Sequence, residues 1–115
     1  MRATIIFLVF TIFINSGYKN QIIPDGLPEC VQKRINEIKS QPVSSPPGKV
    51  FRYFYNLRTV YYIPSKCCDI PSSLLDEDCQ VICYPSGGFT GQGDGKCLDF
   101  LATRSEEKLI WQDPR

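Results

Sequence analysis

The apolar residues of this chain follow a helical repeat in one segment and a strand-like alternation in the segments after it. Val31, Ile35 and Ile38 recur at the spacing of one helical face, with polar residues between them. Pro28 suits the first position of a helix, and Pro42 stops the run. The pattern therefore predicts an N-terminal amphipathic helix that buries this stripe.

A strand signal follows the helix. Residues 50–55 and 59–63 are rich in aromatic and β-branched side chains, and together they predict an antiparallel hairpin. Both central residues of the tightest hairpin turn need a positive φ, a conformation that Leu57 resists. We therefore expect a looser turn or a three-residue loop at 56–58. Because aromatic residues occupy both faces of this hairpin, a face left uncovered by the helix would expose several tyrosines.

Weaker signals follow in the rest of the chain. The pair Leu74-Leu75, the acidic residues 76–78 and the segment 80–84 predict a second, shorter hairpin. Segment 98–111 carries a helical pattern at its start and a strand pattern at its end. These elements indicate an α+β fold, a small disulfide-stapled domain with one N-terminal helix packed on an antiparallel sheet of about four strands. The predicted core consists of Val31, Ile35, Ile38, Val50, Phe54, Val60, Tyr62, Val81 and Trp111.

The N-terminal residues have the three parts of a secretory signal peptide. Arg2 precedes an uncharged apolar run, residues 3–14, and the small or polar residues 15–17 follow it. A membrane-spanning helix needs about 20 apolar residues, more than this run supplies. We therefore expect a secreted or periplasmic protein with no membrane insertion after signal cleavage. The expected parts are a signal peptide (1–17), a mobile leader (18–27) and a single disulfide-rich domain (28–115).

The composition argues against several classes of function. The chain has 13 basic and 12 acidic residues, and removal of residues 1–17 takes away Arg2, so the mature domain is nearly neutral. Nucleic acids and anionic membranes are bound through concentrated positive charge, so we expect neither as a partner. The chain has no histidine, which excludes Ser-His-Asp triads and the usual catalytic zinc sites. We expect no enzyme, no cofactor and no metal, and a partner that is an unknown protein or an envelope component.

Six cysteines in an exported protein predict three disulfides. Structural zinc sites usually take ligands from Cys-x-x-Cys pairs or include histidine, and this chain has neither. Because a bond from the first cysteine closes a long loop, we expect reduction to loosen or unfold the domain. The six are Cys30, Cys67, Cys68, Cys79, Cys83 and Cys97.

Simple geometry argues against two of the possible pairings. Adjacent Cys67 and Cys68 are about 3.8 Å apart at Cα, which is too close for an unstrained bond. We therefore expect each of them to bond to a different element. Cys79 and Cys83 would lie about 13 Å apart on one strand. Cys30, on the first helical turn, would staple the helix to the sheet, and the other pairings stay open.

Residues 85–96 contain five glycines and form the candidate binding segment. No Gly-Lys-Ser/Thr ending follows, so we expect a disulfide-bounded surface loop and not a phosphate-binding loop. A rigid loop with exposed aromatic residues loses little entropy on binding and offers interface anchors. These features predict a non-catalytic binding module, in one form a protease inhibitor. The candidate binding residues are Tyr84, Phe89, Thr90 and Asp94.

Two alternative functions stay open. In the first, the domain is an envelope-associated structural protein whose glycine-rich loop only caps the core. In the second, the carboxylates of Asp94, Asp99 and residues 76–78 serve a small enzyme or bind calcium, since calcium takes oxygen ligands. The EF-hand spacing is absent, however, and Asp-Gly pairs more commonly mark turns in which the carboxylate bonds its own loop.

Several motifs together resemble a known family. They are Pro28-Glu29-Cys30, Val60-Tyr61-Tyr62-Ile63-Pro64, Cys67-Cys68-Asp69 and Ile82-Cys83-x-Pro85-x-Gly87-Gly88-Phe89-x-Gly91-x-Gly93-Asp94-Gly95-Lys96-Cys97-x-Asp99-Phe100. The pattern resembles a group of small exported bacterial proteins known as domain of unknown function 6970. The resemblance runs from Pro28 to the C-terminus and implies export and the domain limits, but no activity, ligand or site. Leu57, where the pattern would have glycine, is a departure that affects only the hairpin turn.

Overall fold

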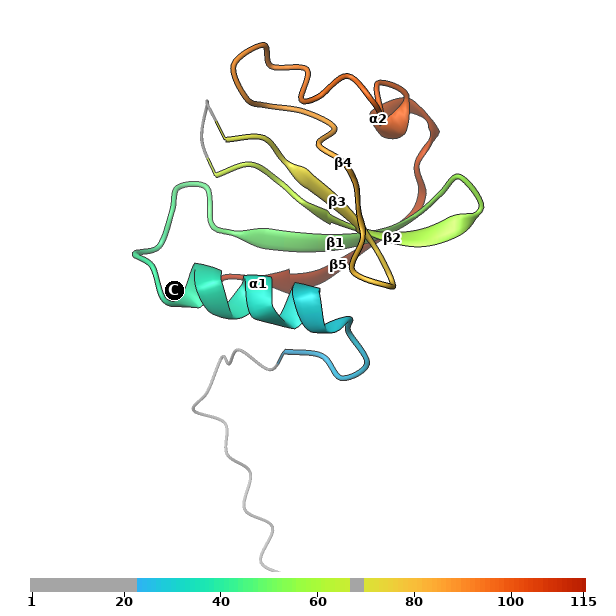
Figure 1. Ribbon diagram of the computed structural model, residues 1–115. Helices are drawn as coiled ribbons and strands as arrows, with labels where there is room; N and C mark the ends of the chain where they lie inside the picture. The colour runs from blue at the N-terminus through green and yellow to red at the C-terminus, as the bar shows by residue number, and fades with distance from the viewer. Residues whose placement is uncertain (1–22, 67–69) are drawn as a thin grey trace, which may run out of the picture.

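The stripe of Val31, Ile35 and Ile38 forms the inner side of helix α1 (Glu29–Lys39) in the computed structural model (Figure 1). The structure describes residues 23–66 and 70–115, so the predicted signal peptide and the cysteines at 67 and 68 lie outside the described residues. Val31 and Ile35 are fully buried, and Ile38 is half-buried beside them. Pro28 is the N-cap, and its carbonyl accepts hydrogen bonds from the backbone N–H groups of residues 31 and 32. The predicted helix is therefore confirmed, with its first residue one position later.

The strands form one five-stranded antiparallel sheet, which confirms the predicted fold class and adds a strand to the expected four. The strand order is β4-β3-β2-β1-β5, so the C-terminal strand returns to pair with β1 at one edge. The strands are β1 (Lys49–Tyr55), β2 (Arg58–Ile63), β3 (Ser73–Asp76), β4 (Val81–Cys83) and β5 (Ser105–Gln112).

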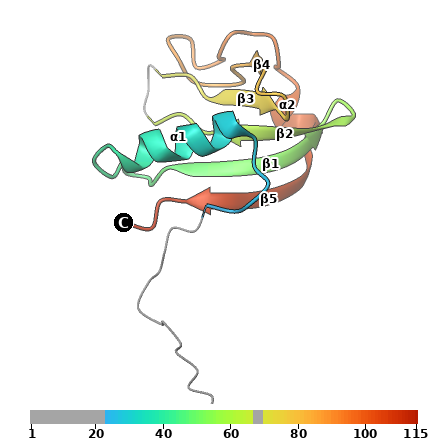
Figure 2. The same ribbon diagram turned by 60° about the horizontal axis from the view of Figure 1, so that its bottom comes forward.

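Helix α1 covers one face of the sheet (Figure 2). Its apolar side packs on a first core cluster that includes Val50 of β1, Tyr61 and Ile63 of β2, and Trp111 of β5. Leu27, just before the helix, is also buried in this cluster, and its carbonyl accepts a hydrogen bond from the side chain of Gln32. The packed part of the chain therefore includes residues ahead of Pro28.

The opposite face of the sheet is covered mostly by irregular chain, namely the segment after β4 and the short helix α2 (Phe100–Thr103) (Figure 1). Phe100 is fully buried, with its ring centroid 5.5 Å from that of Tyr53 and 5.2 Å from those of Tyr55 and Tyr62. All three tyrosines are therefore buried, and this face does not expose them. The second core cluster consists of Tyr53, Tyr55, Val60, Tyr62, Leu74, Cys83, Cys97 and Phe100.

For two residues, Phe54 and Val81, the prediction that they belong to the core is wrong. Phe54 is 36% exposed because it pairs with Thr59 near the hairpin turn, where the hairpin projects past the end of α1 (Figure 1). Val81 is 49% exposed because it begins a three-residue strand at the edge of the sheet. The other predicted core residues are buried, apart from the half-buried Ile38.

The turn between β1 and β2 also differs from the prediction. Tyr55 pairs directly with Arg58, so the loop has two residues, and both have positive φ, 50° at Asn56 and 63° at Leu57. A leucine in this conformation costs about 1–2 kcal/mol. The primed turn nevertheless matches the right-handed twist of the strands, and the packing of the hairpin on both faces outweighs the local cost. Leu57 itself is 90% exposed.

One disulfide, Cys30–Cys79, joins the first turn of α1 to the turn between β3 and β4, with a Cα–Cα distance of 5.6 Å. This confirms that Cys30 staples the helix to the sheet. Cys79 has a φ of 65° and lies outside the strands. The second disulfide of the described segments is Cys83–Cys97. The bonds that we expected Cys67 and Cys68 to make with two different elements fall outside the described residues.

Within residues 23–66 and 70–115, no helix has both the length and the apolar character needed to cross a membrane.

An ion pair between the buried Asp113 and the exposed Arg115 fixes residues 113–115 against α1. Asp113 is 3% exposed, and its backbone N–H donates to the carbonyl of Gly48 at 2.8 Å. The guanidinium of Arg115 donates to the Asp113 carboxylate at 2.7 and 3.0 Å and to the carbonyl of Ile38 at 3.2 Å. Hydrogen bonding from Arg115 lowers the pKa of the Asp113 carboxyl group below its ordinary value. The clamp thus links β5, the start of β1 and the last turn of α1.

The Asp113 carboxylate should make the stability of the domain depend on pH. A carboxyl group with a lowered folded-state pKa stabilises above its unfolded pKa, near 3.8, and that stability is lost as the pH falls through the folded-state value. We expect Asp113→Asn to lower the Tm by roughly 3–6 °C at pH 7. The difference from the natural protein should shrink below about pH 4. Thermal unfolding followed by circular dichroism at both pH values measures this.

The control is Asp78→Asn, which removes a charge from an exposed carboxylate that accepts no hydrogen bond within the described residues. It should leave the Tm within about 1 °C of the natural value at both pH values. A loss at Asp113→Asn that is equal at pH 7 and pH 3 would show that the charge of this carboxylate does not stabilise the fold.

Candidate recognition loop

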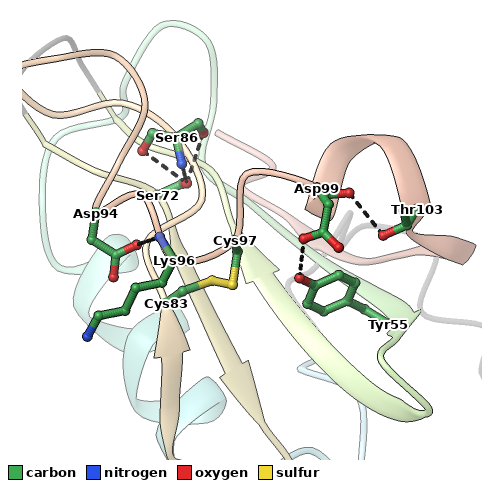
Figure 3. Close-up of a disulfide and its surroundings, with 9 residues drawn as sticks. All are labelled: Tyr55, Ser72, Cys83, Ser86, Asp94, Lys96, Cys97, Asp99 and Thr103. Atoms are coloured by element: carbon green, nitrogen blue, oxygen red, sulfur yellow. Dashed lines mark hydrogen bonds between the residues drawn. A yellow bond between two sulfur atoms is a disulfide. The ribbon is translucent and has the colours of Figure 1, made fainter.

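The glycine-rich segment forms a loop whose two ends are joined by a disulfide (Figure 3). Cys83 ends β4 and Cys97 lies just before α2, with their Cα atoms 6.2 Å apart. Both cysteines are buried in the second core cluster, at 1% and 6% exposure. The recognition loop, residues 84–96, therefore begins and ends at a covalent link that is part of the core.

Backbone hydrogen bonds inside the recognition loop define its path. The N–H of Gly87 donates to the carbonyl of Gly91 at 3.1 Å, and the N–H of Gly93 donates to the carbonyl of Gly87 at 3.0 Å. Nearer the base, the N–H of Asp94 donates to the carbonyl of Tyr84 at 3.0 Å. A loop with this many internal bonds has a defined conformation before any partner binds.

A pair of serines, of which Ser72 is buried, attaches the recognition loop to the sheet (Figure 3). Ser72 is fully buried, and its hydroxyl lies 2.9 Å from that of Ser86. The N–H of Ser72 donates to the carbonyl of Ser86 at 2.8 Å, the N–H of Ser86 donates to the hydroxyl of Ser72 at 3.0 Å, and the Tyr62 hydroxyl lies 3.2 Å from that of Ser86. Sequence reasoning missed this network, because single serines in loop segments carry no periodic signal.

Two glycines in the recognition loop are required by close backbone approach. A Cβ at Gly93 would lie 1.7 Å from the carbonyl oxygen of Tyr84, and a Cβ at Gly87 would lie 2.9 Å from that of Ile70. Both positions also have positive φ, 63° and 79°. Only glycine satisfies both conditions at once, so the loop depends on these residues for its fold.

The four predicted binding residues fall at two levels of the recognition loop. Phe89 and Thr90 form the tip, inside a turn closed by the N–H of Gly91 donating to the carbonyl of Gly88 at 3.3 Å. Phe89 is 99% exposed. Tyr84, which is 38% exposed, and Asp94 lie at the base. The structure thus leaves one large apolar side chain at the tip and places the other aromatic residue well behind it.

Three of the carboxylates considered for catalysis or calcium binding, Asp76, Asp94 and Asp99, already serve as local hydrogen-bond acceptors. Asp94 accepts from the backbone N–H of Lys96 at 3.0 Å, and Asp99 accepts from the hydroxyl of Tyr55 at 2.6 Å (Figure 3). Asp76 accepts two backbone N–H bonds within its own turn, each at 2.9 Å. In the described part of the chain, no group of three or more His, Cys, Asp or Glu side chains is arranged to hold a metal ion.

Two tyrosines of the second core cluster donate hydrogen bonds through their hydroxyl groups. Tyr53 donates to Glu107 of β5, and burial together with this hydrogen bond raises the pKa of Tyr53 to about 12. Burial, and then the bond to Asp99, also raises the pKa of Tyr55. Arg104 lies over the ring of Tyr53, 4.7 Å from its centroid. Both phenols therefore stay protonated near neutral pH and act as hydrogen-bond donors.

A matched pair of glycine substitutions tests the fold of the recognition loop. Gly93→Ala introduces a clash with the Tyr84 carbonyl, whereas an added Cβ at Gly91 meets no atom within 4 Å. Both residues have positive φ, so both changes carry the same kind of backbone cost, about 1 kcal/mol. We expect Gly93→Ala to destabilise the domain by at least about 2 kcal/mol more than Gly91→Ala in urea unfolding. Equal effects would contradict this loop geometry.

The chain matches one family model over residues 36–113, which is more than half of its length. The matched segment begins inside α1 and includes all five strands and the recognition loop. It contains three of the four cysteines of the described disulfides, and Cys30 lies before it. No curated protein and no solved structure matches the chain. The resemblance found in the sequence is thereby confirmed, and the chain belongs to the family described as domain of unknown function (DUF6970).

Proposed function

We propose that this domain is an extracytoplasmic, non-catalytic binding module that inserts Phe89 into an apolar pocket of a partner protein. The observation that supports this most is the 99% exposure of Phe89 at the tip of a tied loop. Burying a phenylalanine side chain is worth about 1.5–3 kcal/mol relative to leaving it in water. A partner that covers this ring would gain that energy directly.

The construction of the loop supports a role in binding. The Cys83–Cys97 bond, the Ser72–Ser86 pair and the backbone bonds at Gly87 and Gly93 restrain the chain on both sides of the tip. A pre-organised loop loses little conformational entropy when it binds, so more of the contact energy appears as affinity. Aromatic anchors held in this way dominate the energy of many protein interfaces.

The backbone at the tip favours insertion of a single side chain over the binding mode of a substrate-like protease inhibitor. Phe89 and Thr90 are the central residues of a tight turn, and Gly87 and Gly88 before them have positive φ. An extended peptide that adds a strand to a protease would need several successive residues in β conformation. The turn instead presents one ring, with small neighbours that allow a partner surface to approach.

The extracytoplasmic location is supported by two kinds of observation. Cys30–Cys79 and Cys83–Cys97 are disulfides, which form and persist in oxidising compartments. The apolar run at residues 3–14 has the length and flanks of a cleaved signal. We propose that residues 1–17 direct export and are then removed.

Mass spectrometry of the protein from its producing cells tests export. We expect it in the medium or the periplasmic fraction, with a mass that lacks the first 17 or so residues. Non-reducing peptide maps should contain the Cys30–Cys79 and Cys83–Cys97 cross-links. Recovery from the cytosol as the full chain from Met1, with these four thiols reduced, would contradict the proposal.

A quantitative affinity experiment tests the role of Phe89. The purified protein is immobilised and exposed to the envelope fraction of the producing cells, and bound proteins are compared among the natural chain, Phe89→Ala and Leu57→Ala. Leu57 is the matched control, because it is also a large apolar side chain at a loop tip, with 90% exposure. We expect a partner whose affinity falls at least about tenfold with Phe89→Ala and is unchanged by Leu57→Ala. A partner that is indifferent to Phe89→Ala, or the absence of any partner, would refute the proposal.

A further inference from the structure

A cavity of about 240 Å³ lies at the end of the sheet where β1 begins and β2 ends. It is bounded by the last turns of α1, the connector at residues 41–48, and residues 63–66, 70 and 71. These chain segments meet at the end of α1 near the C-terminus of the chain (Figure 1). Among the residues of the recognition loop, none lines this cavity.

The walls of the cavity are apolar and stiff. Ile38, Phe51 and Ile63 contribute to them from α1, β1 and β2. Five prolines also line the cavity, and proline has a fixed φ and no backbone N–H to satisfy. A cavity with such walls is pre-formed and offers apolar contact to a ligand. The prolines are Pro42, Pro46, Pro47, Pro64 and Pro71.

Among the described residues that line the cavity, the basic side chains outnumber the acidic ones. Glu37 is the one acidic residue among the described residues of the lining, and its charge is paired with that of Arg34 at 3.1 Å. The two lysines, Lys49 and Lys66, have no carboxylate partner among the described residues. The ammonium of Lys66 donates to the side-chain oxygen of Gln41 at 3.0 Å, which holds it beside the cavity. An anionic group of a ligand would be favoured at this edge.

The volume of the cavity limits the size of the ligand. A dry cavity of about 150 Å³ holds benzene, so 240 Å³ has room for an aromatic ring and a short arm. We propose that this cavity binds a small free aryl-alkyl carboxylate, with its ring against the apolar walls and its carboxylate at Lys49 and Lys66. This inference is independent of the proposed role of Phe89, because it uses a different part of the molecule.

Titration with 3-phenylpropionate, followed by ¹H–¹⁵N correlation spectra, tests the ligand class. We expect saturable binding with a Kd in the millimolar range or tighter, and the largest shifts at the amides of Ile38, Lys49, Phe51 and Ile63. The neutral isostere 3-phenylpropanamide should bind at least about tenfold more weakly, and acetate should give no saturable shifts. Equal binding of the amide, shifts centred elsewhere, or no binding of 3-phenylpropionate would overturn the proposal.

Charge-removing variants test which residues recognise the carboxylate. Lys49→Gln and Lys66→Gln should each weaken 3-phenylpropionate binding by roughly three- to tenfold, because each removes one ammonium from the edge of the cavity. The control is Lys108→Gln on β5, which removes the same charge from a residue that does not line the cavity. It should leave the Kd unchanged. Unchanged binding in both cavity variants, or an equal loss in the control, would refute the assignment of these lysines.

Discussion

The structure depends on covering both faces of one aromatic hairpin. Strands β1 and β2 carry apolar side chains on each side, with Val50, Tyr61 and Ile63 facing α1 and Tyr53 and Tyr62 facing away from it. A sheet buried on both faces needs two covering layers. The described residues contain one long helix, so the second layer is built from irregular chain and a four-residue helix. The special features of the molecule follow from the need to hold that irregular layer in place.

Irregular chain brings few apolar residues and many backbone polar groups to a sheet, so it requires specific attachments. Phe100 supplies the apolar contact, and the phenol of Tyr55 bonds to Asp99 on the covering segment. The Tyr55 phenol donates from the sheet outward, which joins this covering segment to the core by a hydrogen bond as well as by packing. Because the Cys83–Cys97 bond fixes the base of the recognition loop, the tip of that loop can project into solvent without loosening the fold. The exposed Phe89 is thus compatible with a well-ordered domain.

Periodic signals in the sequence were sufficient for the elements but not for their arrangement. The helix and both hairpins could be predicted, since Val31, Ile35 and the aromatic strands repeat at the helical and strand periods. The pairing of β5 with β1 could not be predicted, because it joins residues more than fifty positions apart and six residues of that strand are exposed. Leu57 shows the same limit on a local scale. Its positive φ contradicts its own preference and is imposed by the pairing of Tyr55 with Arg58.

The candidate site was predictable in part, for a related reason. The five glycines and flanking cysteines identified residues 85–96 as a closed loop, and Phe89 as its aromatic residue. The Ser72–Ser86 pair and the cavity at the end of the sheet depend on contacts between distant segments, which leave no pattern in the chain. Sequence therefore located the feature that is local and missed those that arise only on folding.

The positions of the two described disulfides show where non-covalent contact is weakest. Strand β4 has three residues and lies at the edge of the sheet, and the bonded cysteines Cys79 and Cys83 stand just before it and at its end. In the chain-entropy model, loops of 49 and 14 residues correspond to about 4 and 3 kcal/mol of stabilisation. Those values are comparable with the whole stability of a small domain, about 5–15 kcal/mol. The cross-links therefore add most stability where the strand pairing is shortest. They also fix the position of β4, the edge strand from which the recognition loop begins.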